Sequence, residues 1–500
     1  MGAEVSSRDY TREDRRVFRR KLHECSDALG RMVHDAVFAD DRTPPRPLLG
    51  MEIEFGLVRS DMQPALASAD VLTAIDEAAV FQTELGRFNI EMNAPPEPLS
   101  GEGTFELERN LRASLHIADA RIHDHDAELV TIGMLPTLGL EHFTPRSITD
   151  NPRYRQLNDQ IVAARGEDIE LAIDGVPLQG SPTERLRVDC DSVVPEAACT
   201  SLQLHLRIAP EHFARHWNAA QAIAGVQVAI GANSPFLAGR ALWHESRLPV
   251  FEQATDTRPP ELANQGVRPR VWFGERWIDS VTELFDENAR WFPALLPEIT
   301  DEDPAAVLGA GGTPALGELA MHNGTVYRWN RPVYDVVDGV PHLRIENRVL
   351  PSGPTVIDMM ANAVFFYGLQ RGLVESETPI EERTSFDAAS ENLRTAAMFG
   401  MDARLYWPGS GRVGADELVL RTLLPIADAG LASLGLTARA RDRYLAVIEG
   451  RCVTRRTGAA WQREQVAQRE RAGESRDVAL ANMLRDYVSA MHDGSPVHTW

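Results

Sequence analysis

Residues 50–58 read GMEIEFGLV, a strand-like stretch in which apolar residues alternate with Glu52 and Glu54. Side chains along a β-strand point to opposite faces in turn, so the apolar residues share one face and the two glutamates share the other. Two carboxylates on one face of a strand can bind neighbouring hard cations. The stretch therefore predicts a strand with a core on one side and a charged site on the other.

Three later stretches repeat this alternation. They read FNIEMN (88–93), LQLHLRI (202–208) and LRIENRV (343–349). If all four stretches lie in one sheet, their acids and one histidine converge on one surface, namely Glu52, Glu54, Glu91, His205 and Glu346. Such a group of acids is unfavourable unless cations neutralise it, and carboxylates with histidine suit Mg²⁺ or Mn²⁺ better than zinc.

A solvated sheet face is the alternative explanation for each stretch taken alone, because antiparallel sheets often bury one face and hydrate the other. Solvated faces are rich in Lys and Thr, and the polar sides of these four stretches contain neither. Taken jointly, the stretches favour a functional surface.

The composition indicates a globular protein with a large core. A chain of 500 residues with 43% hydrophobic content can form one large catalytic domain with additions, or two to three domains. No run reaches the roughly 18 apolar residues of a membrane span, and the charged first residues do not resemble a secretory signal. The four cysteines are scattered without a CxxC pair, which fits a reducing compartment and argues against a zinc knuckle. We therefore expect a cytoplasmic protein without a membrane partner.

The charges constrain the chemistry. A formal net charge of −22 argues against nucleic-acid binding. Lys21 is the only lysine and follows Arg20, so a Walker A loop is absent, and any phosphate must be handled by arginines and metal ions. The candidate phosphate or carboxylate clamps are Arg207, Arg328, Arg331 and Arg348. Two further arginines, Arg240 and Arg247, could bind a substrate carboxylate.

The order of elements predicts an α+β fold. Strands and helices mix over the first two thirds, and helices dominate from residue 354 onward, so we expect helices to cover one face of the sheet and leave the charged face open. We divide the chain into an N-terminal helical extension (1–46), a catalytic domain (47–375) and a helical C-terminal region packed on it (376–500). Finer expectations are a helix over 8–40, a chain break at 43–47 and a strand stop at 94–96. We also expect an irregular segment over 152–200 with weak strands near 169–173 and 184–189, and one long helix over 457–491.

Five motifs in this order resemble those of the glutamate–cysteine ligase and related carboxylate–amine ligase family. They are GMEIEFGLV (50–58), ELGRFNIEMNAPP (84–96), TSLQLHLRI (200–208), ANSPFLAGR (232–240) followed by Arg247, and RIENRVL (344–350). The resemblance covers roughly residues 48–375. It implies a glutamine-synthetase-like fold, a curved and mostly antiparallel sheet that forms a funnel with helices outside.

The resemblance also implies an activity and its cofactors. Such enzymes use ATP and Mg²⁺, with Mn²⁺ as an alternative, to convert a carboxylate into an acyl phosphate that an amine then attacks. The resemblance assigns metal binding to Glu52, Glu54, Glu84, Glu91, His205 and Glu346. It also implies a phosphate contact for Arg348, a contact with the transferring phosphate or the substrate for Arg331, and a metal or nucleotide-phosphate contact for His205. Together with the candidate arginines above, we expect catalysis by Arg348, Arg331 and Glu54, nucleotide contacts by His205, Arg207, Arg328 and Arg348, and substrate contacts by Arg240, Arg247 and Asn233. Many relatives carry H-x-H where this chain has Gln203-Leu204-His205.

The leading hypothesis is ligation of the glutamate γ-carboxylate to L-cysteine, the first step of glutathione biosynthesis, by a small-molecule enzyme that forms a homodimer. Another amine or carboxylate on the same scaffold is the nearest alternative, and the prokaryotic ubiquitin-like protein ligases share the fold and a similar opening strand. A non-catalytic nucleotide-binding protein is an alternative of another class. A metal-dependent hydrolase would need fewer arginines and a histidine-rich pair of metal sites.

Overall fold

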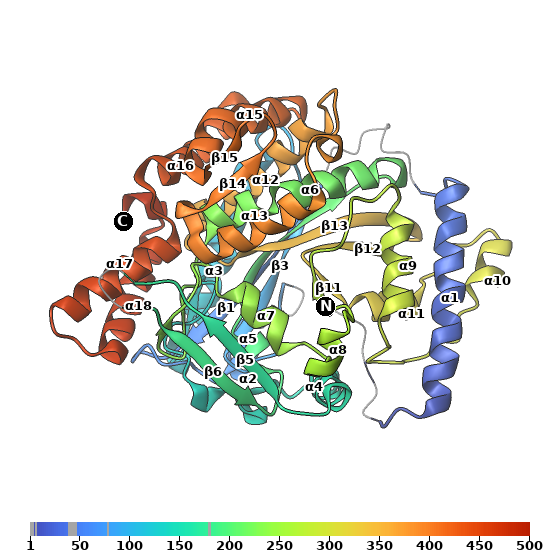
Figure 1. Cartoon of the computed structure of the whole chain (residues 1–500), viewed down its shortest axis with the longest axis horizontal. Helices are drawn as coiled ribbons and strands as arrows, with labels where there is room; N and C mark the ends of the chain where they lie inside the picture. The colour runs from blue at the N-terminus through green and yellow to red at the C-terminus, as the bar shows by residue number, and fades with distance from the viewer. Residues whose placement is uncertain (1–4, 6–7, 39–47, 78–79, 179–181) are drawn as a thin grey trace.

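The computed structural model describes residues 5, 8–38, 48–77, 80–178 and 182–500. A seven-stranded antiparallel sheet crosses the middle of the molecule in the order β12-β13-β7-β1-β3-β2, with β4 paired to β1 (Figure 1). Its strands are β1 (Leu48–Val58), β2 (Phe81–Thr83), β3 (Asn89–Pro98), β4 (Glu128–Val130), β7 (Ser201–Arg207), β12 (Asn330–Val337) and β13 (Val340–Pro351). The predicted α+β class with a curved antiparallel sheet is confirmed.

Helices cover the apolar face of this sheet. The buried α6 (Pro210–Gly231) packs against β13, and α3 (Gly103–Ile122) packs against β3. The apolar α12 (Val356–Val374) is buried on nearly all sides, because α6 lies against one side and α15 (Leu424–Ser433) and α16 (Ala438–Thr454) lie against the other. A helix with no polar face must be buried in this way.

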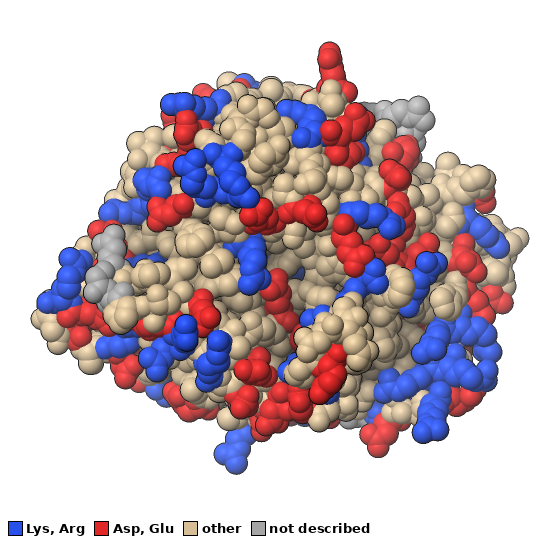
Figure 2. Space-filling model, viewed as in Figure 1, with Lys and Arg blue, Asp and Glu red and all other residues tan. Residues whose placement is uncertain are grey.

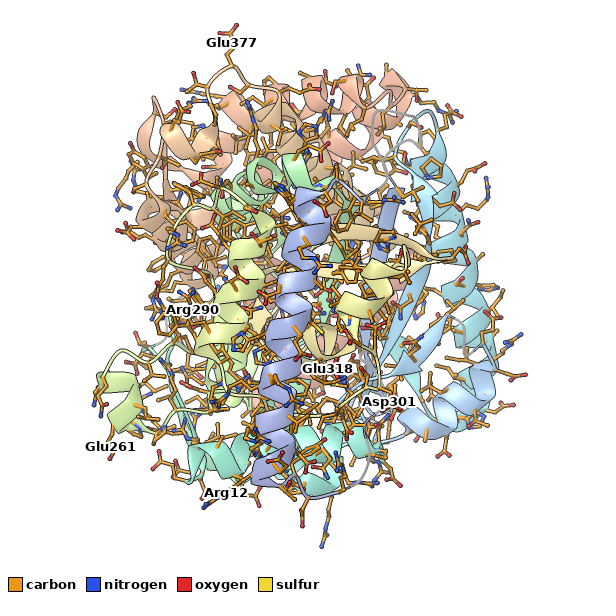
Figure 3. All side chains as sticks on the ribbon, turned by 90° about the vertical axis from the view of Figure 1, so that its right-hand side faces the viewer. Arg12, Glu261, Arg290, Asp301, Glu318 and Glu377 are labelled. Carbon is orange, nitrogen blue, oxygen red and sulfur yellow. The ribbon has the colours of Figure 1, made fainter. Side chains whose placement is uncertain are left out.

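The N-terminal helix α1 (Arg12–His34) packs on the molecule through one apolar stripe. It begins at Thr11, which forms a capping box with Asp14. Its partners are α9 (Val281–Trp291), α10 (Pro304–Gly309) and α11 (Gly317–Asn323). Figure 3 shows Glu318 of α11 beside it, where Lys21 Nζ lies 3.5 Å from a Glu318 carboxylate oxygen. The only lysine of the chain is therefore a bridge between α1 and α11.

Smaller elements complete the chain. Two-stranded sheets are β5 (Ile169–Asp174) with β6 (Arg185–Cys190), β8 (Phe236–Leu237) with β9 (Arg240–Ala241), β10 (Val271–Trp272) with β11 (Tyr327–Arg328), and β14 (Arg404–Trp407) with β15 (Gly411–Gly414). The other helices are α2 (Ser68–Ile75), α4 (Pro152–Arg165), α5 (Val194–Ala197), α7 (Arg247–Ala254), α8 (Pro260–Asn264), α13 (Phe386–Phe399), α14 (Ala415–Leu418) with a π-helical turn at Val419–Leu423, α17 (Gly458–Arg471) and α18 (Arg476–Asp493). Among the described residues, no helix is long and apolar enough to cross a membrane.

Three finer predictions were wrong. The expected helix over 457–491 is two helices, α17 and α18, because the chain turns at Gly473, whose φ of 97° favours glycine. In the segment 152–200 the two expected strands are present as β5 and β6, but the first part is not irregular, because α4 fills it with Asn151 as N-cap and Pro152 in the first turn.

The strand β3 does not stop at 94–96 but continues to Pro98, past two prolines. The pairing with β1 shifts register between Leu49 and Met51, opposite this segment. Proline is tolerated at such an irregularity because the ladder hydrogen bonds are already interrupted there. The helix expected over 8–40 is shorter at both ends, since α1 spans Arg12–His34. Residues 39–40 and the break expected at 43–47 lie outside the described residues.

The three-part division stays a prediction. The parts of the chain before and after residue 375 are in extensive contact, since α12 packs against α15 and α16. The predicted boundary near residue 46 lies outside the described residues.

Candidate active site

The strand register brings the predicted acids together on the polar face of the sheet, where Glu54, Glu91 and Glu346 are buried. Across β7 and β13, His205 pairs with Glu346, and across β13 and β12, Glu346 pairs with Arg331. Across β1 and β3, Glu54 pairs with Glu91. Residues two apart on a strand share a face, so Glu52 joins this group beside Glu54.

Glu52, His205 and Glu346 form one cluster, with one possible ligand atom from each within 4.8 Å of the others. The Nε2 atom of His205 lies 3.1 Å from Oε1 of Glu52. Glu346 is held between two guanidinium groups, with Arg331 Nη2 at 2.8 Å from Oε2 and Arg348 Nε at 3.0 Å from Oε1. Burial by itself would raise the pKa of Glu346, but Arg331 and Arg348 lower it well below its usual range.

Glu54, Glu84 and Glu91 form a second cluster, also with ligand atoms within 4.8 Å of one another. Burial and the charges of Glu52 and Glu54 raise the pKa of Glu91 to about 8. Burial, then Glu91 and Glu54, raises the pKa of Glu84 well above its usual range. These carboxyl groups repel one another when they are ionised.

Glu54 is oriented by hydrogen bonds from residues of the adjacent strand β7. It accepts hydrogen bonds from the Ser201 backbone N (2.7 Å), from Ser201 Oγ (2.8 Å) and from Gln203 Nε2 (3.0 Å). Gln203, two residues before His205 on the same strand, therefore supports Glu54.

Both clusters fit divalent cations bound through oxygen. Carboxylates at this spacing are the ligands that Mg²⁺ and Mn²⁺ take, and a cation would relieve the repulsion that raises the pKa values of Glu84 and Glu91. The Nε2 atom of His205 is buried without a hydrogen-bond partner among the described residues, and it faces the first cluster.

Two charged residues of the site were missed by the sequence analysis. Glu196, on the short α5, is half-buried, and burial followed by the charge of Glu54 raises its pKa to about 8. Arg153, on α4, is close enough to Arg331 and Glu84 for its charge to interact with both. The Asn151-Pro152 cap could have revealed α4, but no strand alternation marks Glu196.

Three of the four arginines predicted to bind phosphate lie on the polar sheet face, and Arg328 lies apart from them. Arg331 and Arg348 lie in the first cluster, and Arg207 lies on the same sheet face, opposite Arg344. The bonds of Arg328 run to α9, with Nη2 at 2.8 Å from Glu287 Oε2 and Nε at 3.1 Å from Asn288 Oδ1, and its guanidinium stacks over Trp272.

Of the three residues predicted to bind substrate, Arg247 and Asn233 are buried and bind other parts of the chain. Arg247 is buried, with Nε at 2.9 Å from Glu245 Oε1, and its Nη2 donates to the carbonyl of Val349 at 2.6 Å. Asn233 donates from Nδ2 to the carbonyl of Ser352 and to the Tyr487 hydroxyl, both at 2.8 Å. Arg240 is exposed on the β8–β9 hairpin.

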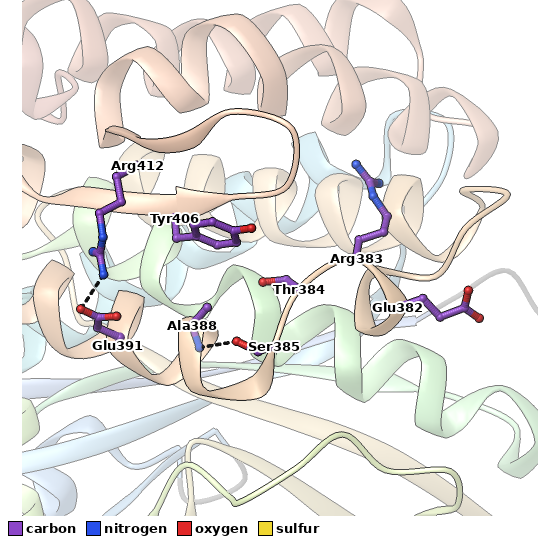
Figure 4. A pocket seen from close by; sticks show the side chains of 8 residues that line it. All are labelled: Glu382, Arg383, Thr384, Ser385, Ala388, Glu391, Tyr406 and Arg412. Atoms are coloured by element: carbon purple, nitrogen blue, oxygen red, sulfur yellow. Dashed lines mark hydrogen bonds and ion pairs between the residues drawn. The ribbon is translucent and has the colours of Figure 1, made fainter.

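A separate pocket of about 450 Å³ lies over the start of α13 and the β14–β15 hairpin (Figure 4). Its lining includes Arg383, Ser385, Tyr406 and Arg412 but none of the predicted site residues. Figure 2 shows acidic and basic side chains interspersed with other residues over the face that includes this region.

The chain is similar to known proteins in both sequence and fold. A family model described as "Glutamate-cysteine ligase family 2 (GCS2)" matches residues 48–481. A search of curated proteins returned no match. A glutamate–cysteine ligase from Francisella tularensis in complex with AMP has a similar structure, with a TM-score of 0.53, 11% sequence identity and 89% of each chain covered.

Two other solved structures are less similar. A bifunctional glutathione synthetase from Pasteurella multocida gives a TM-score of 0.49 at 12% identity, with 89% of this chain and 52% of the other covered. The complex of the prokaryotic ubiquitin-like protein Pup with its ligase PafA gives 0.34 at 10% identity, with 87% and 71% covered. The conclusion rests on the family model, which spans most of the sheet and the C-terminal helices, and on the fold shared with the first structure. The chain therefore belongs to glutamate–cysteine ligase family 2 and is an ATP-dependent ligase.

Proposed function

We propose that this ligase joins the γ-carboxylate of glutamate to the amine of L-cysteine and so supplies the dipeptide for glutathione biosynthesis. The observation that carries the proposal is the pair of neighbouring carboxylate clusters on the polar sheet face, with Arg331 and Arg348 beside one of them. This arrangement suits the binding of nucleotide phosphates through divalent cations and arginines.

The carboxylates would hold the cations. We assign Glu52, His205 and Glu346 to one cation and Glu54, Glu84 and Glu91 to its neighbour, as Mg²⁺ or Mn²⁺. Bound cations would neutralise the negative charges of the nucleotide phosphates. Glu54 is fixed by Ser201 and Gln203, so its carboxylate is oriented before any ligand arrives.

The arginines would stabilise the transferring phosphoryl group. Because Glu346 binds both Arg331 and Arg348, the two guanidinium groups are held side by side at the first cluster. The γ-phosphoryl group passes from ATP to the glutamate carboxylate, which gives ADP and an acyl phosphate. The amine then attacks the acyl carbon, phosphate leaves, and the amine loses a proton.

Arg247 and Asn233 would act through the backbone. Arg247 binds the carbonyl of Val349 and also lies 3.3 Å from that of Arg348, so it holds the part of β13 that carries Arg348. We propose that these two residues position the arginine and that Arg207 contacts the nucleotide. Arg240, at the exposed hairpin, and Arg328, bound to α9, stay candidates for substrate and nucleotide contacts.

Phosphate release from Mg·ATP with L-glutamate tests the proposal, across a panel of amines with and without L-cysteine and with product masses measured. Cysteine-dependent release together with the mass of γ-glutamylcysteine is expected. Glu52→Gln should abolish both, whereas Glu170→Gln, at an exposed position of β5, should change neither.

Other outcomes would replace parts of the proposal. Release with a different amine would keep the ligase and change the acceptor, and release with a different acid would change the donor. Nucleotide binding without turnover for any pair would indicate a non-catalytic protein.

We also propose that the protein is a cytoplasmic homodimer. Light scattering after size-exclusion chromatography should then give twice the chain mass of 55.4 kDa. A mass equal to that of one chain would contradict this assembly.

A further inference from the structure

An apolar surface joins α8 and the end of α9. Leu262, Val267 and Trp291 are exposed there, at 39%, 40% and 48%. They are connected, because the Val267 backbone N donates to the Leu262 carbonyl at 3.1 Å and the guanidinium of the next residue, Arg268, lies 4.3 Å from the centre of the Trp291 ring. We call these four residues the α8–α9 face. Single exposed apolar side chains are normal, whereas connected ones mark interaction sites.

Trp291 stands at the outer end of a stack of arginine and tryptophan side chains. The guanidinium groups of Arg328 and Arg268 lie 4.5 and 5.3 Å from the centre of the buried Trp272 ring. Arg268 also donates from Nη2 to Glu275 Oε2 at 2.6 Å. Each of these contacts attracts a cation to an aromatic ring and fixes both groups. The exposed ring therefore loses little side-chain freedom when a partner covers it.

Two unpaired charges of opposite sign belong to the same two helices. Glu261 lies on α8 and Arg290 on α9, and both are exposed. Neither side chain makes a hydrogen bond or ion pair with any residue that the structure describes. Figure 3 shows both at the same edge of the molecule.

A surface with one unpaired acid and one unpaired base can be complementary to itself. In a two-fold symmetric contact, a residue i of one copy meets a residue j of the other, and j meets i. Glu261 would then face the partner's Arg290, and the same pair would form a second time on the other side of the axis. The matching partner for such a surface is a second copy of this chain.

We propose that the α8–α9 face is the contact surface of the homodimer, with Trp291 near its two-fold axis and Glu261 paired with the partner's Arg290. Trp and Arg are among the residue types that supply most of the binding energy of protein interfaces, and the charged residues form the polar rim around them. This inference rests on the homodimer of the proposed function and is independent of the amine that the ligase uses.

Sedimentation equilibrium tests the role of the tryptophan. Trp291→Ala should weaken dimerisation about 30-fold or more, as loss of a central interface residue does. Phe399→Ala is the matched control, because Phe399 is also an exposed aromatic residue (40%) at the last position of its helix, α13, and it should leave the dimer intact. Circular dichroism checks that both variants fold. Dimerisation of Trp291→Ala as tight as that of the wild type would overturn the proposal.

Charge reversal tests the pairing across the axis. Arg290→Glu and Glu261→Arg should each weaken dimerisation about tenfold or more, because like charges then meet twice. An equimolar mixture of the two variants should dimerise as the wild type does, because one chain then carries two acids and the other two bases. Arg19→Glu, at an exposed position of α1, should change nothing. A mixture no better than its separate components would contradict the pairing.

The assembly and the activity are measured separately, so they can fail separately. A wild type with the mass of one chain would overturn both the homodimer and this contact surface, whatever its turnover. A dimer that tolerates Trp291→Ala, Arg290→Glu and Glu261→Arg would keep the homodimer and overturn the α8–α9 face as its contact surface.

Discussion

Glu346 holds the first cluster together at the level of single residues. It binds Arg331 and Arg348 at once and lies within reach of Glu52 and His205. Two arginines side by side would repel each other without it. The sequence indicated Glu346 and Arg348 by the strand pattern, but the bridge to Arg331 depends on the pairing of β12 with β13.

Replacing Glu346 with Gln should lower kcat/KM at least about 100-fold, because a cation ligand is lost and both arginines lose the group that orients them. Steady-state kinetics with ATP and glutamate would measure this loss. Thermal unfolding monitors the fold, and Glu170→Gln is again the control. Activity within tenfold of the wild type would show that Glu346 has no such role.

The raised pKa values of the second cluster predict how stability depends on pH. Glu91 has a pKa of about 8 in the folded protein and an ordinary value of 4.5 when unfolded, so the folded state binds more protons between these values. The free energy of unfolding of the metal-free protein should therefore fall as pH rises from about 5 to about 8. Glu84 and Glu196 add to this fall, since their pKa values are also raised.

Urea unfolding across this pH range, with a chelator present, measures the slope. Glu91→Gln should make it less steep by up to about 1.4 kcal/mol per pH unit, the contribution of one proton. Mg²⁺ should restore stability at pH 8 by neutralising the carboxylates. Equal slopes in the variant and the wild type would show that Glu91 is ionised throughout.

Between elements, the buried pair of Glu245 and Arg247 ties α7 to β13. Arg247 binds the carbonyl of Val349 and contacts that of Arg348, and its guanidinium lies over the Trp329 ring. Glu245 in turn accepts from the Asn233 backbone N at 2.9 Å. The ANSPF motif therefore acts as a support beneath the site.

Arg247→Met should cost about 3–5 kcal/mol of unfolding free energy, because it leaves Glu245 as an unpaired buried charge. The double variant Glu245→Gln with Arg247→Met should recover part of this loss, since no charge then remains unpaired. Urea denaturation of the two single variants and the double variant would show this. A double variant less stable than the sum of the single losses would contradict the pairing.

Across the whole molecule, the C-terminal helices reach the motifs that precede the site. The Tyr487 hydroxyl of α18 donates to the Thr131 carbonyl at 2.8 Å and accepts from Asn233, and Gln462 of α17 donates to Asn233 Oδ1 at 2.8 Å. The rings of Trp461 and Trp500 lie against Tyr487.

Tyr487→Phe should cost about 1–3 kcal/mol of unfolding free energy, because buried partners lose the hydroxyl. Urea unfolding followed by circular dichroism and by tryptophan fluorescence should give one shared transition, shifted to lower urea. Tyr406→Phe, at a partly exposed ring, should leave the transition in place. Two separate transitions would show that the C-terminal helices unfold independently.

The sequence by itself determined the strands and the faces of the sheet. Alternation is a local property, so it placed Glu52, Glu54, Glu91, His205 and Glu346 on polar faces correctly. Helices with a cap and an apolar stripe, such as α1, were predicted for the same reason. The family motifs then indicated the fold and the class of reaction.

Only the tertiary structure decided which residues meet. Strand order and register depend on contacts between residues far apart in the chain, so Arg331 joined Glu346 while Arg328 turned to α9. Glu196 and Arg153 carry no alternation that marks them, and long-range packing alone brings them near the acids. Arg344 likewise reaches His205 from a neighbouring strand, because a hydrogen bond depends on distance in space and not on spacing in sequence.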